Sequence, residues 1–301
     1  MRKRVYRCLC APVFVVAVSW LAPAPAAGQT WTPGRTPDGQ PDIQGTWQGG
    51  PGNAGHSLEE GCCEVEHNRM QNRNPANIGL PYQVIVEPRD GKIPFQPWAA
   101  AKRQEHLVAM ETPTELQHIE PEDRCSLGGV PRSQLRGAMK IQQIPGHVVI
   151  QYEWIHAFRI IPLGGSHPPK ELTLWQGDSR GRWEGNTLVV DVTNFRYDAV
   201  GYNKQPWLDS HGTFYTDALH VVERWTFVDA NTINYEATIE DPKVFTQPWK
   251  VAFRIPRHAD KNFELIEEAC WEGVSVKHRL DIGKMNIKAG KTSVHSHGEV
   301  K

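Results

Sequence analysis

From about residue 140 onward, apolar and polar residues alternate with a period of two, and this pattern constrains the fold more than any other feature. Such alternation is typical of half-buried β-strands. Gly185–Asn186 and Asp229–Asn231 stand where tight turns are needed between strands. Because no helical pattern intervenes, we predict an all-β body over residues 140–280, an antiparallel meander that closes into a barrel or a strongly curved sheet. Its strands are expected within residues 147–163, 187–195, 219–242, 249–255 and 262–271.

The N-terminal residues predict export. A basic start, the apolar run at 11–21 and a small-residue segment ending near Ala26–Ala27 predict a cleavable signal peptide over residues 1–27. The apolar run is shorter than a membrane span, so we expect a periplasmic or secreted protein with no integral membrane segment after cleavage.

The arm and the tail differ from the body in composition. Residues 28–139 are rich in Pro, Gly, Asn and Gln, which predicts an irregular arm packed on the body. One short helix is expected at 96–110, with four residues sharing a face: Trp98, Ala101, His106 and Met110. The polar residues 281–301 predict a flexible tail.

Four cysteines follow the predicted signal peptide, Cys62, Cys63, Cys125 and Cys270. In an oxidising compartment they allow three pairings, between which the sequence does not decide. We favour a disulfide between Cys125 and Cys270, which would tie an early segment to a late strand. A zinc site is the alternative interpretation, but the spacings lack its regularity, so no metal is predicted.

Charge and motifs narrow the classes of function. The formal net charge is −1 and no Lys/Arg cluster follows the signal peptide, so no nucleic-acid partner is expected. No nucleophile elbow, phosphate-binding loop or dinucleotide fingerprint stands between a predicted strand and a predicted helix, the setting that such motifs require, and we predict no cofactor. The oligomeric state is not indicated.

Four residues are candidate catalytic groups: Glu223, Asp191, His156 and Arg159. Glu223 is predicted to lie on the same strand face as Val221 and Trp225, where burial of a charged carboxylate is costly. It is therefore either a general acid or base, or the ion-pair partner of an arginine such as Arg159 or Arg182. The ion pair is the favoured interpretation. His156 shares the predicted face of Trp154 and Phe158, where a core histidine is the competing reading.

The remaining histidines and Asp191 are placed by strand parity. His220 points away from Glu223 if its strand is regular, which excludes a direct dyad between them. His167 and His211 are expected in loops. Asp191 lies in mid-strand, which is unfavourable unless a partner or a pocket meets it.

Eleven tryptophans, several beside these polar residues, predict an aromatic-lined pocket. The ligand-binding candidates are Tyr152, Trp154, Arg182, Trp183, His220, Trp225 and Trp249. Three functions fit: binding of a small apolar or amphipathic molecule, a cofactor-free hydratase, lyase, isomerase or cyclase acting through carboxylate, His and Arg, or a carbohydrate-active protein of the cell surface. The sequence leaves open whether the protein is an enzyme or a binder.

Two resemblances bear on these hypotheses. The segment IQGTWQGG is similar to the Gly-x-Trp opening of lipocalins. The motifs CSLGGVPR, IQQIPGHVVIQYE, FRII, GDSRGRWEGNTLVVDVTNF, ALHVVERW, IEDPKVFTQPW and ACWEG, in this order, resemble a widespread family of secreted bacterial proteins with no assigned activity. The resemblance covers roughly residues 43–273 and implies an exported, lipocalin-like β-barrel of open function. Asn186 and Trp271 stand where the family pattern has Asp and His, so any catalytic use of that His is not available to this chain.

Overall fold

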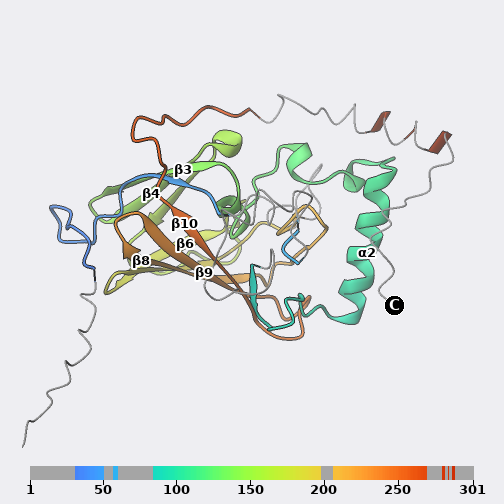
Figure 1. Cartoon of the computed structure of the whole chain (residues 1–301). Helices are drawn as coiled ribbons and strands as arrows, with labels where there is room; N and C mark the ends of the chain where they lie inside the picture. Colours follow the sequence, from blue (N-terminus) through green and yellow to red (C-terminus); the bar gives the residue numbers. More distant parts are fainter. Residues whose placement is uncertain are drawn as a thin grey trace, which may run out of the picture. The chain divides into compact units, whose positions relative to one another are not determined.

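The computed structural model describes residues 31–50, 57–59, 84–197 and 206–269, with positions 280, 281, 284, 287 and 288. Residues 32–301 belong to one unit, and its described strands form two antiparallel sheets (Figure 1). The predicted all-β, antiparallel class is therefore confirmed.

The smaller sheet has four strands in the order β1-β3-β4-β5. The bounds of these strands are Gly45–Gln48 for β1, Ala138–Ile144 for β3, His147–Tyr152 for β4 and Phe158–Pro162 for β5. The outer and inner faces alternate in burial along β4 and β5, as the sequence pattern predicts.

The larger sheet has six strands in the order β2-β10-β9-β8-β7-β6. The strands run Ile85–Glu87 (β2), Asp178–Glu184 (β6), Thr187–Thr193 (β7), His220–Asp229 (β8), Thr232–Glu240 (β9) and Trp249–Pro256 (β10). Gly185 and Asn186 form the turn between β6 and β7. Gly185 has a φ of +61°, a conformation that glycine adopts without strain.

The two sheets meet at both pairs of edges without forming one continuous ladder. Leu163 bridges Gly181 beside β5 and β6, and Trp47 of β1 bridges Arg257 just after β10. The described residues thus show edge contacts at both joins but no closed barrel. Between the sheets lies a core that includes fully buried Trp47, Trp225 and Tyr235.

The helix and the short turns complete the described elements. Helix α2 spans Pro97–Glu111, in agreement with the predicted helix, and begins with proline in its first turn. The ring of His106 stacks on Trp207 at a centroid distance of 5.1 Å. Trp98 and His106 both pack against Phe214, at centroid distances of 5.7 and 5.5 Å, so these two residues share a face as predicted. Ala101 is exposed. The 3₁₀ helices are η3 Leu116–His118, η4 Glu122–Arg124, η5 Arg132–Leu135 and η6 Trp154–His156.

The strand predicted through residues 147–163 is interrupted. After β4, Ile155 and His156 adopt φ angles of 54° and 38°, and the backbone amide of Tyr152 donates to the carbonyl of Ala157. This turn reverses the chain, so β4 and β5 pair as a hairpin. His156 consequently lies exposed at the turn and does not share a strand face with Phe158.

The predicted strand at 262–271 is also wrong for its described part, because residues 262–269 carry no strand. The reason lies in the arm. Strand β2 pairs with one edge of β10 while β9 pairs with the other, so no edge of β10 remains for a further strand. The arm predicted as irregular therefore supplies two edge strands, β1 and β2.

Candidate functional site

Glu223 lies in a buried hydrogen-bond network between the two sheets. Its Oε2 is 2.5 Å from Nη2 of Arg159, and its Oε1 accepts from Gln134 Nε2 and Tyr235 OH, each at 2.8 Å. The Glu223 side chain is fully buried and that of Arg159 is 2% exposed. The predicted ion pair between Glu223 and an arginine is therefore present, with Arg159 as the partner. Arg159 neutralises the carboxylate, and Gln134 and Tyr235 donate to its second oxygen.

This environment sets the ionisation of its members. Burial, the largest single effect, would lower the pKa of the Arg159 guanidinium, but Glu223 together with Tyr152 and Tyr235 outweighs burial, and the pKa is raised. Burial also raises the pKa of the Tyr152 phenol, whose OH lies 3.4 Å from Gln134 Oε1. Burial and the adjacent Glu223 carboxylate together raise the pKa of Tyr235. Both phenols therefore stay neutral and donate hydrogen bonds at neutral pH.

A second buried charge cluster surrounds Arg132, at the end of the CSLGGVPR motif. Its guanidinium contacts Glu120 at 2.7 Å, and also contacts Glu122. Burial, opposed by Arg132, raises the pKa of Glu122 to about 8. Sequence reasoning missed this cluster because η4 and η5 gave no periodic signal.

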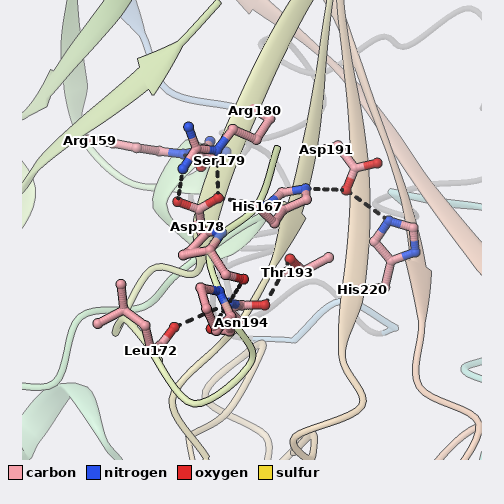
Figure 2. Close-up of polar contacts among 12 residues, drawn as sticks. Arg159, His167, Leu172, Asp178, Ser179, Arg180, Asp191, Thr193, Asn194 and His220 are labelled. Atoms are coloured by element: carbon pink, nitrogen blue, oxygen red, sulfur yellow. Dashed lines mark hydrogen bonds and ion pairs between the residues drawn. The ribbon is translucent and has the colours of Figure 1, made fainter. Parts of the chain in front are cut away.

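A third polar group lies on the outer face of the larger sheet (Figure 2). Oδ1 of Asp191 is 3.2 Å from Nε2 of His167 and 3.1 Å from Nε2 of His220. Nδ1 of His167 is 2.6 Å from Oδ2 of Asp178, and Arg180 holds Asp178 by two hydrogen bonds of 2.8 and 2.9 Å. These residues form a chain from Arg180 through Asp178, His167 and Asp191 to His220, which we call the Asp191 relay.

Strand register and one asparagine position the relay. In the β6–β7 hairpin Arg180 stands opposite Asp191, and in β7–β8 Asp191 stands opposite Val222, two residues from His220. His167 arrives from the loop between β5 and β6. Nδ2 of Asn194, a residue with a φ of 57°, donates to the carbonyls of Pro168, Pro169 and Leu172 and so fixes this loop to the end of β7 (Figure 2).

A groove of about 420 Å³ lies on the outer face of the smaller sheet. Its walls come from β4, the η6 turn, β5 and the segment 265–267, and include the predicted residues Tyr152 and His156. Phe158, Ile160 and Ile266 line it with exposed fractions of 64%, 51% and 67%. The carbonyl of Glu268 lies 3.1 Å from Nδ1 of His156, a contact that holds the 265–267 segment beside the sheet.

The predicted tryptophans take structural positions. Trp225 packs edge-on against Tyr235 and Trp249 against Phe245, with ring centroids 4.9 and 5.4 Å apart. Trp154 is nearly buried and lies under the guanidinium of Arg136. The indole N–H of Trp183, in β6, is buried and makes no hydrogen bond.

Arg182 lies apart from every one of these groups. Its side chain is exposed and pairs with Glu184 at 2.9 Å, so it does not contact Glu223. Burial thus separates the predicted residues into an interior set around Glu223 and Arg159 and an outer set around Asp191 and His220.

Cys125 is disulfide-bonded. Cys62, Cys63 and Cys270 lie outside the described residues, so the pairing of Cys125 with Cys270 stays a prediction. Across the part of the chain that the structure describes, no three His, Cys, Asp or Glu side chains have the arrangement of a metal site.

Comparison with family models, with curated proteins and with solved structures finds no match for this chain. Among the described helices, none combines the length and the apolar character needed to cross a bilayer.

Proposed function

We propose that the protein binds a small apolar or amphipathic molecule in the groove on the outer face of β4 and β5. The observation that carries the proposal is the exposure of Phe158, Ile160 and Ile266 on one hollowed surface. In the register of β4 with the edge strand β5, Val149 stands opposite Ile160, and Gln151 stands opposite Phe158. The apolar side chains Val149, Phe158 and Ile160 therefore lie close together on one face of these two strands. A contiguous exposed apolar surface of this kind is typical of ligand or partner sites.

The lining indicates the chemistry of the ligand. A volume of about 420 Å³ is within the range of about 300–1,000 Å³ that small-molecule sites occupy. The polar lining side chains are Gln151, His156 and Glu267, besides the largely buried Tyr152. Glu267 is the single acidic group in this lining, which favours a neutral or cationic amphiphile over an anionic one.

This proposal places the ligand outside the core and not in an enclosed aromatic pocket. The interior positions expected to line such a pocket, Trp225 and Trp249, are instead packed against Tyr235 and Phe245. We also propose that the two sheets, with their contacts at both edges, form a strongly curved, lipocalin-like barrel, and that the protein acts after export to the periplasm or the medium. The edge bridges at Leu163 and Trp47 support the first of these statements.

Titration with N-phenylnaphthylamine, a neutral dye that becomes fluorescent in apolar sites, tests the groove. Phe158→Ser and Ile160→Ser each remove a large apolar side chain from the groove. A loss of about 1.5 kcal/mol, the low end for burying such a side chain, should weaken dye binding about tenfold. Ile144→Ser is the matched control, because Ile144 is a similarly exposed apolar residue of β3 outside the groove.

The control should bind the dye as the unaltered protein does. Equal weakening by Ile144→Ser, or unchanged binding in both groove variants, would reject the groove as the binding site.

A further inference from the structure

The Asp191 relay holds His167 at both ring nitrogens. Nδ1 lies 2.6 Å from Oδ2 of Asp178, and Nε2 lies 3.2 Å from Oδ1 of Asp191. Arg180 forms a further ion pair with Asp178. These contacts fix the orientation of the His167 ring beside Asp191.

The contact with Asp191 sets the tautomer of a neutral His220 ring. Nε2–H then donates to Oδ1 of Asp191, 3.1 Å away, which leaves the lone pair on Nδ1. Nδ1 is 3.9 Å from Oε2 of Glu240, which is longer than a hydrogen bond. The side chains of Asp191 and His220 are each 35% exposed, so part of the imidazole ring is open to solvent.

We infer that His220 is a general base and that Asp191, His167 and Asp178 are positioning residues that orient it. A carboxylate that fixes the tautomer of an imidazole through one nitrogen while the other takes a proton is a recurrent arrangement in proton-transfer enzymes. The substrate class is a molecule with an acidic C–H or O–H proton that can reach the outer face of β7 and β8. This activity is independent of ligand binding in the β4–β5 groove.

Nitrobenzisoxazole, used with the full-length protein, is a suitable probe because it needs a base and nothing else. His220 Nδ1 takes the carbon-bound proton, and the C–H electron pair completes the nitrile. The N–O bond breaks, and its electron pair stays on the oxygen, which becomes the phenolate. The imidazolium then returns its proton to water.

We expect the protein to exceed free imidazole at equal concentration, and His220→Gln to lower kcat roughly 100-fold, the low end for general-base catalysis. His147→Gln, a histidine of β4 on the other sheet, should leave kcat unchanged. Asp191→Asn should lower kcat without changing KM, because a neutral amide oxygen stabilises the imidazolium that forms at His220 less than a carboxylate does.

Three outcomes would overturn the inference. They are a folded His220→Gln variant with unaltered kcat, a protein no faster than imidazole, and a rate abolished by a metal chelator. If His220→Gln does not fold, carbethoxylation of the folded, unaltered protein replaces it: loss of kcat must then follow modification of His220 as located by peptide mass.

Discussion

Replacing Glu223 by glutamine removes the charge from a buried carboxylate that three donors surround. An amide cannot accept at both of its ends, so its NH₂ group faces either Arg159 or the pair Gln134 and Tyr235. Arg159 then keeps a buried charge without a counter-ion. Removing one partner of a buried ion pair costs about 3–5 kcal/mol, and for a domain of this size each kcal/mol lowers Tm by about 2–4 °C. We therefore expect Tm to fall by about 6–20 °C.

Urea unfolding followed by tryptophan fluorescence measures this loss, since Trp225 packs directly on Tyr235 of the network. Glu184→Gln is the control, because Glu184 forms only exposed ion pairs with Arg182 and Arg224, and its urea midpoint should not move. In the double variant Glu223→Gln/Arg159→Met the loss should be smaller than the sum of the single losses, because no unpaired charge remains.

A Glu223→Gln variant with unchanged Tm that lost dye binding or proton-transfer activity would refute the structural interpretation. Glu223 would then be a working acid or base.

Two more predictions concern alkaline stability and the loop that carries His167. Burial raises the pKa values of Tyr152, Tyr215 and Tyr235, so the folded state keeps protons that the unfolded state loses above about pH 10. The contribution of the three phenols to stability is full below that pH, and it falls above it by about 1.4 kcal/mol per pH unit for each phenol. The phenolate absorbance of these tyrosines should rise only together with loss of circular dichroism. Complete ionisation of the tyrosines in a folded protein would contradict the prediction. Asn194→Ala removes the hydrogen bonds to the loop and places alanine at a left-handed φ, so it should lower the free energy of unfolding by about 2–3 kcal/mol in all. Asn194→Gly removes the hydrogen bonds alone. Amide exchange across residues 164–174 should accelerate in both variants, and protection retained by Asn194→Gly would show that the side chain does not fix the loop.

The alternation of residues was sufficient to predict the strands whose faces differ in polarity. Residues 219–242 fold into β8 and β9 around the expected turn, and Glu223 has the inward direction that its parity predicted. Charge also predicted that an arginine would pair with Glu223, because a buried acid needs a cation, but the choice of Arg159 over Arg182 came from the structure. In the β6–β7 hairpin, a two-residue turn places Arg180 opposite Asp191, a pairing that could be read from the sequence.

Long-range contacts could not be obtained in this way. The sequence carries no local sign that β2 occupies the free edge of β10, and that pairing is why residues 262–269 form no strand. His156 fits the alternation around it, yet left-handed φ angles at Ile155 and His156 turn the chain there. His167 was missed as the residue that links Asp178 to Asp191, because the loop with His167 is positioned by Asn194, about 26 residues away along the chain.

The β4–β5 groove and the Asp191 relay lie on different sheets, which meet where β5 and β6 approach each other, and β5 contributes residues to both the groove and this join. Phe158 and Ile160 point outward into the groove, while Arg159 between them points inward to Glu223 and to Ser179 Oγ of β6, at 2.9 Å. Asp178, next to Ser179 in β6, points to the opposite face and holds His167 (Figure 2). β5 and β6 belong to different sheets, and the buried contact of Arg159 with Ser179 joins them beside the Leu163–Gly181 bridge and the hydrogen bond from Gly164 N–H to the carbonyl of Gly181. The Glu223 network is therefore best understood as the support that sets the positions of both outer faces, which explains why charged groups occupy the core of a β-structure whose chemistry we place on its surface.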